Sequence, residues 1–424
     1  MPRTFDWPKL EDELVRILEN GPDAGPELAE ALAISQPSFS RLIRRVDERV
    51  VAFGRARHRR YGLRRPAAFG NPVPVYDIDA HGQVRQRFTI DAIVPSGLTV
   101  DGNRVKPDVF DDLPWFFWAL RPAGRLGRRV PRQLQGWPAV PAWSAEQTVT
   151  YARQFGWDLP GGFVVGDAAL EQAQARTLEP VDYAARAHDT DVHDPGSWVG
   201  GMHPKFLAPA KIVKFSPPRS DAAGRRTADL LVAEHLALTI LQEAGHDAAP
   251  TSIIEDDDRT FLEVERFDRT PKGRRSWVPL DALTPTLGEG SNTTSGLATR
   301  LLVRQHIDET TLRAIRFRAQ FAEWIACADE GRSTLGFFLK GPTLVGLAPA
   351  FGLGPSAYAE PHRDPELPVR VALPSNADVA PAAHAAAVRF WQTVDADGRM
   401  SSEFRAIADR RIARLARVRL ATPD

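Results

Sequence analysis

Three apolar stripes at helical spacing within residues 9–65 constrain this chain more than any other feature of its sequence. Gly21-Pro22 ends the first helix and Pro26 starts the second, while Ser35 and Pro37 suit the N-cap and first turn of the third. The side chains that the spacing predicts to face inward are Leu10, Leu14, Ile17 and Leu18, then Leu28, Ala31 and Leu32, then Phe39, Leu42, Ile43 and Val46. Two short helices, a tight turn and a third helix are typical of a helix-turn-helix.

A short apolar run, a glycine and a basic segment follow the third helix, at residues 50–53, 54 and 55–61. This order predicts a β-hairpin with a basic tip, which is the wing of a winged helix. We therefore expect residues 1–66 to form a winged helix-turn-helix domain.

Positive charge is concentrated in this segment, although the formal net charge of the whole chain is zero. Between residues 35 and 65 ten arginines stand against two acids. Because duplex DNA is a dense line of phosphates, this pattern favours DNA binding over the alternative, a solvated basic face on a small protein-interaction domain. A homodimer that reads two half-sites would suit this motif. The candidate DNA-binding residues are Gln36, Ser38, Ser40, Arg41, Arg44, Arg45, Arg55, Arg57, Arg59 and Arg60.

Length and composition limit the class of protein. At 424 residues the chain is too long for one hydrophobic core, so we expect several domains. A single cysteine, Cys327, excludes an intramolecular disulfide and fits a reducing compartment. The first residues do not resemble a signal peptide, and no uncharged apolar run is long enough to span a bilayer. We predict a cytoplasmic protein without a membrane partner.

The sequence after residue 66 changes to strand-like alternation. Residues 73–78 and 83–90 alternate on either side of a turn and predict a hairpin. The aromatic cluster at 115–117 is best explained as core packing.

A lysine and a glutamate further along the chain each need an oppositely charged partner. Residues 210–216 predict a strand with Lys214 among apolar neighbours, and residues 226–244 predict a helix with Glu234 on its apolar face. An unpaired buried charge is costly, so we expect the two to pair. A strand lysine paired with a helix glutamate beside a glycine-containing loop is how kinase folds hold nucleotide phosphates. The alternatives are a structural ion pair or two unrelated surface residues.

Four segments in this order resemble the HipA family of serine/threonine-kinase toxins. They are Ser-x-x-Gly-Gly-x-x-Pro-Lys-Phe from position 197, Val-Lys-Phe-Ser-Pro-Pro from 213, Ala-Asp-Leu-Leu-Val-Ala-Glu from 228 and Phe-Leu-Glu-Val-Glu-Arg-Phe-Asp-Arg from 261. The chain resembles in particular the branch often called YjjJ or HipH, which carries its own N-terminal helix-turn-helix. The resemblance implies an α+β fold, in which the winged helix precedes a HipA-like, protein-kinase-like domain of two lobes. We expect a β-rich subdomain at 67–185, a kinase-like N-lobe at 186–283 and a helical C-lobe at 284–424.

The same resemblance implies roles for individual residues. Lys214, held by Glu234, would contact ATP phosphates, and Glu265 and Phe267 would offer backbone hydrogen bonds to adenine. The loop that contains Gly200 and Gly201 would cover the phosphates. Ser197 would match the serine that family members autophosphorylate, and Asp329 the catalytic aspartate.

Two positions depart from the family's metal-binding pattern. The catalytic run Asn-Thr-Asp-x-His-x-x-Asn corresponds to residues 327–334, where Thr334 replaces the metal-binding asparagine and Gly331 the histidine. In the run Leu-Ala-Pro-x-Tyr-Asp, Gly352 replaces the magnesium-binding aspartate. Magnesium needs oxygen ligands and bridges the phosphates during transfer, so ATP is the expected ligand while these positions offer no good Mg²⁺ site.

Three hypotheses follow. The chain is a HipA-type kinase acting on a protein substrate, a pseudokinase that regulates transcription through its winged helix, or a toxin that has lost its activity. We expect ATP and DNA binding with weak or absent kinase activity. The sequence identifies neither the protein substrate nor an antitoxin.

Overall fold

The computed structural model describes residues 5–55, 58–106, 108–122, 137–138, 140–175, 179–192, 203–256, 258–290, 293–328, 334–359 and 376–418. The chain divides into two compact units. Unit 1 comprises Met1–Arg121, Leu134–Arg176 and Lys272–Ser276, and unit 2 comprises Pro122–Gln133, Thr177–Pro271 and Trp277–Asp424. Both units mix helices with sheets, as the α+β class requires. The boundaries proposed after residues 66, 185 and 283 stay a prediction.

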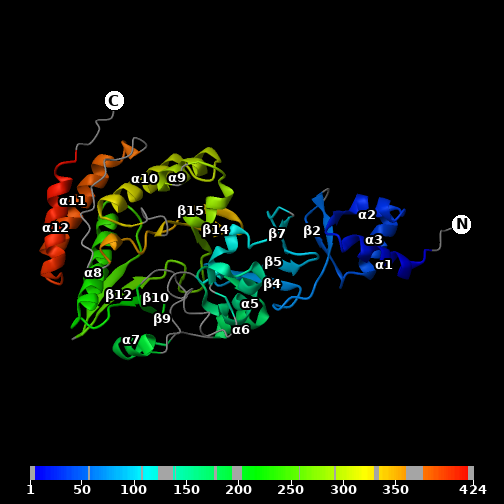
Figure 1. The fold of residues 1–424 in the computed structure, drawn as a ribbon, viewed down its shortest axis with the longest axis horizontal. Coiled ribbons are helices and arrows are strands. Elements are labelled where there is room, and N and C mark those ends of the chain that lie inside the picture. Colours follow the sequence, from blue (N-terminus) through cyan, green and yellow to red (C-terminus); the bar gives the residue numbers. More distant parts are fainter. Residues whose placement is uncertain are drawn as a thin grey trace. The chain divides into compact units, whose positions relative to one another are not determined.

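Unit 1 begins with helices and a three-stranded sheet of order β1-β3-β2, drawn in blue in Figure 1. The elements are α1 (Trp7–Leu18), β1 (Asp23–Ala24), α2 (Gly25–Ala31), α3 (Gln36–Arg45), β2 (Val50–Phe53) and β3 (Arg60–Leu63). The Ser35 side chain caps α3 by accepting a hydrogen bond from Ser38 N, as predicted. Strands β2 and β3 pair as the expected hairpin.

The predicted apolar stripes form one buried core, with two corrections. Ala31 is exposed, and Ala29 takes the inward place beside Leu28 because these two residues and Leu32 line one face of α2. Ser38, which we expected to face solvent or a ligand, is buried. Its hydroxyl lies 3.0 Å from Ser35 Oγ at the N-cap, so it belongs to the cap of the helix.

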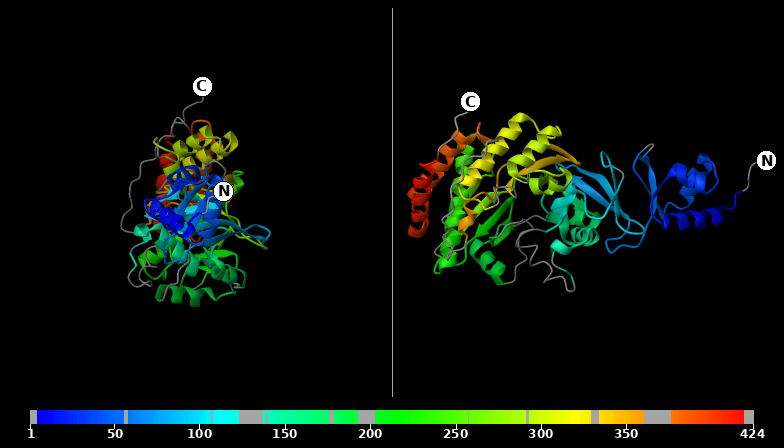
Figure 2. Two further views of the ribbon diagram at one scale, coloured as in Figure 1. Left: turned by 90° about the vertical axis from the view of Figure 1, so that its right-hand side faces the viewer. Right: turned by 45° about the horizontal axis from the view of Figure 1, so that its top comes forward.

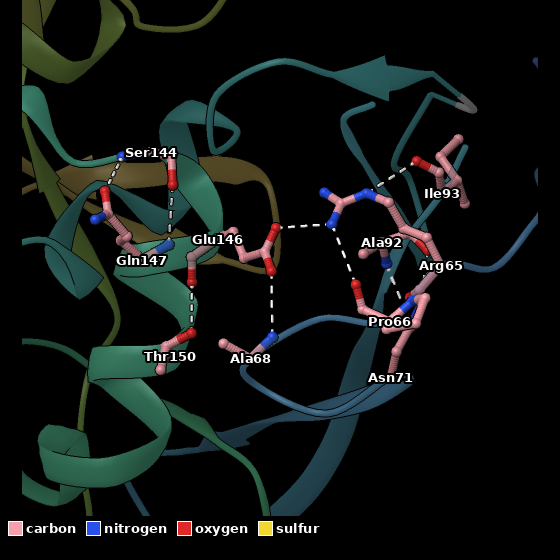
Figure 3. A network of polar contacts seen from close by, with 10 residues as sticks. All are labelled: Arg65, Pro66, Ala68, Asn71, Ala92, Ile93, Ser144, Glu146, Gln147 and Thr150. Carbon is pink, nitrogen blue, oxygen red and sulfur yellow. Dashed lines mark hydrogen bonds and ion pairs between the residues drawn. The ribbon is translucent and has the colours of Figure 1, made fainter. Parts of the chain in front are cut away.

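Two arginines connect this first part of unit 1 to the residues that follow it, and Figure 3 shows the contacts of the second, Arg65. Arg64 Nε donates to Asp91 Oδ1 at 2.6 Å, and Arg65 Nη1 donates to Glu146 Oε2 at 2.9 Å. Asn71 Nδ2 adds a hydrogen bond to the Arg65 carbonyl at 2.9 Å. Residues on both sides of position 66 therefore pack together within unit 1.

The second sheet of unit 1 has five strands in the order β7-β6-β5-β4-β8. They are β4 (Val73–Ile78), β5 (Val84–Ala92), β6 (Leu98–Gly102), β7 (Val109–Phe110) and β8 (Phe163–Val165), accompanied by η2 (Trp115–Leu120), η3 (Val140–Ala142), α5 (Ala145–Phe155), η4 (Gly156–Asp158) and α6 (Asp167–Ala175). Strands β4 and β5 form the predicted hairpin. Phe116 and Phe117 pack on Phe88 with ring centroids 5.3 and 5.2 Å away, which confirms the aromatic cluster as core.

Unit 2 opens with a four-stranded antiparallel sheet of order β11-β12-β10-β9 (Figure 1). Its elements are α7 (Tyr183–Val192), β9 (Lys205–Ala208), β10 (Lys211–Phe215), α8 (Ala222–Glu243), β11 (Thr251–Glu255) and β12 (Thr260–Glu265). Helix α7 packs on one face of the sheet and α8 on the other. Helix α8 starts before residue 226 because Asp221 caps it by accepting from Gly224 N at 2.5 Å. It ends before Gly245, whose φ of +81° suits a C-cap.

Most of the rest of unit 2 is helical and packs around α8, and Figure 2 shows the last two helices in orange and red. The helices are η5 (Leu280–Thr286), α9 (Thr294–Val303), α10 (Glu309–Trp324), η7 (Ser356–Tyr358), α11 (Ala380–Ala396) and α12 (Ser402–Leu415). Helix α11 ends at Ala396, next to Asp397 and Gly398, and α12 begins at Ser402. The C-lobe that we expected to be helical also contains two strands, β14 (Gly336–Lys340) and β15 (Thr343–Leu347), which form a sheet with β13 (Trp277–Pro279).

Candidate functional site

Strand β10 and helix α8 bring the predicted lysine and glutamate together. Lys214 Nζ lies 2.6 Å from each carboxylate oxygen of Glu234, and the two side chains are 13% and 5% exposed. Strand alternation turns Val213 and Phe215 toward α7, so Lys214 takes the face that α8 covers. The expected pairing is therefore present as a largely buried ion pair.

The loop after β15 passes close to this pair. Gly352 has φ +63°, and a Cβ atom at this position would lie 3.9 Å from Lys214 Nζ and 3.3 Å from Thr334 Cγ2. A Cβ at Gly354 would lie 3.4 Å from Glu234 Cα. Positions 334 and 352, which the sequence resemblance matched to metal ligands, are thus neighbours at this site, and neither carries a carboxylate or a carboxamide.

The backbone at the end of β12 offers two hydrogen-bonding groups. Glu265 N donates to the Pro250 carbonyl at 2.9 Å, but Pro250 has no N–H to donate back to the Glu265 carbonyl. Two residues later, Phe267 N donates to no residue in the described ranges. One acceptor and one donor therefore remain available at the two positions expected to contact adenine. Because proline has no N–H, Pro250 was a sequence signal for the unpaired Glu265 carbonyl, and the sequence analysis missed it.

An aromatic cluster joins the end of β12 to the Gly352 loop. The Phe267 ring lies 5.2 Å from the rings of both Trp277 and Phe351, and Trp277 lies 5.3 Å from Phe351. Because Phe351 directly precedes Gly352, the position of this cluster sets the position of the loop beside Lys214.

The most specific part of the sequence motif, residues 266–269, forms a buried ionic turn. Asp268 accepts hydrogen bonds from Arg266 Nε and Nη2, both at 3.1 Å, and from Arg269 Nη1 at 2.8 Å. Arg266 and Asp268 are each 5% exposed. These charges fix the chain directly after Glu265 and Phe267, so their role is to position those residues.

Sequence reasoning missed a buried arginine on α10 that hydrogen-bonds to the backbone just before the Gly352 loop. Arg318 donates to the Ala348 carbonyl at 2.9 Å and to the Asp247 carbonyl at 2.8 Å. Burial lowers the pKa of Arg318 to about 10. Its position on a helix with a mixed pattern gave no sign that it would turn inward.

A second ionic cluster, also missed from the sequence, lies on the α7 side of the same sheet. Glu263 accepts hydrogen bonds from Lys211 Nζ at 2.7 Å, Ser252 Oγ at 2.6 Å and Tyr183 Oη at 2.6 Å. Burial opposes ionisation of Glu263, but these hydrogen bonds outweigh it and hold the pKa of its carboxyl below the usual value. Burial and the bond to Glu263 raise the pKa of Tyr183 to about 12.

Several predicted residues lie outside the described ranges. They are Ser197, Gly200, Gly201, Asp329 and, in the hairpin of unit 1, Arg57. Within the residues that the structure describes, no three His, Cys, Asp or Glu side chains are grouped so that they could hold a metal ion. The roles expected for these five residues stay predictions.

The basic side chains of α3 differ in their surroundings. Arg41 and Arg44 are exposed and make no hydrogen bond or ion pair with the described part of the chain. Arg45 pairs with Glu11 at 2.5 Å and lies over the ring of Trp7. Arg41 and Arg44 are therefore the arginines of α3 most available to an anionic partner.

The remaining candidates of this region are divided in the same way. Ser40 and Arg59 are exposed, whereas Gln36 Nε2 donates to the Gly25 carbonyl at 3.5 Å. Arg55 donates to Asn103 at 3.5 Å, and Arg60 donates to the Pro22 carbonyl at 2.7 Å. Some of the predicted DNA-binding side chains therefore form hydrogen bonds within unit 1.

Comparison with known proteins agrees with this architecture. Residues 69–174 match the family model of the YjjJ-like toxin middle domain, and residues 197–418 match that of the HipA-like C-terminal domain. The chain is 32% identical to Toxin YjjJ of Escherichia coli (strain K12), over 93% of this chain and 95% of the relative. The chain therefore belongs to the HipA family, among the YjjJ-like toxins.

A solved structure supports the fold. The Toxin Antitoxin System HipA, HipB and its operator DNA complex of Shewanella oneidensis MR-1 contains a chain that matches with a TM-score of 0.50. The match has 13% identity and covers 81% of this chain and 97% of that chain. At this identity the likeness concerns the fold alone. Among the described helices, none is both long and apolar enough to cross a membrane.

Proposed function

We propose that this YjjJ-like protein binds ATP at Lys214 in a protein-kinase-like site and transfers phosphate weakly or not at all. One observation carries the proposal: a side chain at position 352 would begin 3.9 Å from Lys214 Nζ, and position 352 is a glycine. The ammonium that would hold the phosphates is present and oriented by Glu234. The oxygen ligand that would hold Mg²⁺ next to those phosphates is missing.

The backbone near the end of β12 supports a nucleotide as the ligand. The Glu265 carbonyl and the Phe267 N–H would pair with the amino group and a ring nitrogen of adenine. The ammonium of Lys214 would take the phosphates. With Asp329 as the catalytic base, a threonine hydroxyl as a poor substitute for asparagine at position 334 and no side-chain oxygen at position 352, the metal's electrostatic stabilisation of the transition state would be reduced.

A thermal-shift titration with ATP, with and without Mg²⁺, tests this function. We expect ATP alone to stabilise the protein, by about 2.7 kcal/mol at a concentration near 100 times the dissociation constant. Lys214→Met should remove the shift. A chain that ATP does not stabilise, or that transfers labelled phosphate from ATP to itself or to a lysate protein at ordinary kinase rates, would contradict the proposal.

Restoring the metal ligands is the complementary test. Gly352→Asp combined with Thr334→Asn should make the ATP shift larger when Mg²⁺ is present. Aspartate is among the residues that best tolerate a left-handed φ, and the second change replaces the methyl group that a Cβ at 352 would meet at 3.3 Å. Gly341→Asp is the matched control, since Gly341 also has a positive φ, +59°, and a Cβ there would have no neighbour within 4 Å.

The first part of unit 1 supports a second proposed activity, DNA binding by a winged helix-turn-helix. Helix α3 would enter the major groove and the β2–β3 hairpin would act as the wing. The side chains of Arg41 and Arg44, which are exposed and pair with none of the residues that the structure describes, favour DNA binding over a helix used only for packing. A chain that binds both ATP and DNA would act as a pseudokinase-type transcriptional regulator.

The salt dependence of DNA affinity tests this activity. Each neutralised phosphate contributes about −0.9 to the slope of log K against log salt, so Arg41→Gln with Arg44→Gln should reduce the slope by about 2. Arg45→Gln is the matched control, because the Arg45 guanidinium already pairs with Glu11 and should leave the slope nearly unchanged. Equal effects of the two variants, or no preference for any duplex over competitor DNA, would contradict the assignment.

The partners of the chain are proposals of the same kind. The solved relative is described in complex with HipB and operator DNA. By analogy this chain would bind an operator, and an antitoxin or a protein substrate would be its protein partner. A homodimer would present two copies of α3 to two half-sites.

A further inference from the structure

A five-residue segment of the chain leaves unit 2 close to the candidate nucleotide site and packs inside unit 1. Residues 272–276 belong to unit 1, whereas the chain on either side of them, up to Pro271 and from Trp277, belongs to unit 2. On the amino-terminal side this segment follows Phe267 by five residues. On the carboxyl-terminal side it leads directly into Trp277, whose ring contacts Phe267 and Phe351.

Buried polar contacts hold the segment in unit 1. Arg274 N donates to the Asp79 carbonyl and Arg274 Nη2 to the Trp157 carbonyl, both at 2.9 Å. Ser276 Oγ donates to Asp77 Oδ1 at 3.2 Å. Arg274 and Ser276 are each less than one-tenth exposed, so these bonds are shielded from water.

The backbone packing is equally close. A Cβ at Gly273 would lie 2.0 Å from the Asp79 carbonyl oxygen, and a Cβ at Gly82 would lie 2.2 Å from the Lys272 carbonyl oxygen. Because no side chain fits at either place, the segment and the β4–β5 turn must move together. Unit 1 also contains α3 with Arg41 and Arg44.

We propose that residues 272–276 couple ATP binding in unit 2 to DNA binding by unit 1; this inference rests on the proposed function. A shift of Ser276 is passed through one peptide bond to Trp277, and from its ring to Phe351 and to Gly352 beside Lys214. Closing the site on a nucleotide therefore displaces or strains the segment that unit 1 holds. By linkage, any factor by which ATP changes DNA affinity is the factor by which DNA changes ATP affinity.

The test measures ATP affinity of the full chain with and without a saturating DNA duplex, and DNA affinity with and without ATP. In the wild-type chain we expect each ligand to change the dissociation constant of the other by at least about fivefold, and the factor should be the same for ATP acting on DNA as for DNA acting on ATP. Arg274→Ala with Ser276→Ala should bring the ratio close to one while each ligand alone binds as before. Arg85→Ala is the control, because the Arg85 side chain is exposed on β5 and its only hydrogen bond among the described residues is to Gln83.

The outcomes separate the inference from the function on which it rests. If both ligands bind but neither alters the other's affinity, or if the double variant keeps the wild-type ratio, the coupling is refuted and the proposed function stands. If ATP or DNA does not bind at all, the proposed function fails and the coupling with it. Hydrogen exchange gives a readout that needs no DNA: ATP should change the exchange of Gly82 N–H and Arg274 N–H, which both donate to the Asp79 carbonyl.

Discussion

The Lys214–Glu234 pair gives the sharpest prediction, because stability and nucleotide binding should respond to it differently. We consider Lys214→Met, Glu234→Met and the double variant. The ammonium lies 2.6 Å from both oxygens. At an effective dielectric constant of 20 the attraction is about 6 kcal/mol, which is offset by a desolvation cost of several kcal/mol for each ion. The intact pair therefore contributes little to the free energy of unfolding, but removing one partner leaves the other charge buried and unpaired.

The single changes should cost about 3–5 kcal/mol each. The destabilisation by Lys214→Met should lie near the upper value, because this change leaves Glu234, which is 5% exposed, without a partner. Glu234→Met leaves a lysine that is 13% exposed without a partner, so its cost should be lower. The double variant replaces the pair with apolar side chains of similar length. Its stability should lie within about 1 kcal/mol of the wild type, as replacement of buried ion pairs often does.

The assay is urea unfolding of each variant with and without ATP. ATP should stabilise the wild type, but neither Lys214→Met nor the double variant. Lys211→Met is the control for the loss of a lysine on the same strand, since Lys211 pairs with Glu263 toward α7 and should keep the ATP effect. A double variant as unstable as the two single changes added together would refute the coupling of the charges. A double variant that ATP still stabilises would refute Lys214 as a phosphate contact.

Three further predictions concern stability. Arg64→Met should lower the free energy of unfolding by about 3 kcal/mol at neutral pH, because it leaves the Asp91 carboxylate buried and unpaired. Burial already raises the pKa of Asp91, so Asp91 should take up a proton as the pH falls toward about 4, and the cost of the substitution should then become smaller. Equal costs at both pH values would contradict this. Glu263→Gln should destabilise by about 1–2 kcal/mol at pH 7. Because the folded-state pKa of Glu263 is lowered, its contribution is present above about pH 4.5 and lost as the pH falls further, so unfolding curves of variant and wild type should converge in acid. Gly224→Ala should cost at least about 2 kcal/mol despite the better helix propensity of alanine, since its Cβ would lie 1.8 Å from the Pro218 carbonyl oxygen; a more stable variant in thermal unfolding would refute this.

Local patterns predicted most of the elements. The first three helices of unit 1, the Ser35 cap and the β4–β5 hairpin each depend on residues that are close together in the sequence. The early start of α8 was missed, although its cap at Asp221 is also local. The β14–β15 hairpin was missed although it is local, whereas the pairing of β13 with β14 was missed because β13 lies far from its partner in the sequence.

The features of the candidate site can also be separated into those set by local sequence and those set by tertiary packing. By itself the sequence determined the order of the motifs, the need of Lys214 and Glu234 for partners, and the absence of a side-chain oxygen at position 352. Only the tertiary structure decided that Arg45 meets Glu11, 34 residues away along the chain, and that residues 272–276 belong with unit 1. The physical reason is that periodicity and capping are set by neighbours along the chain, whereas pairing of charges is set by packing between segments that the sequence does not place side by side.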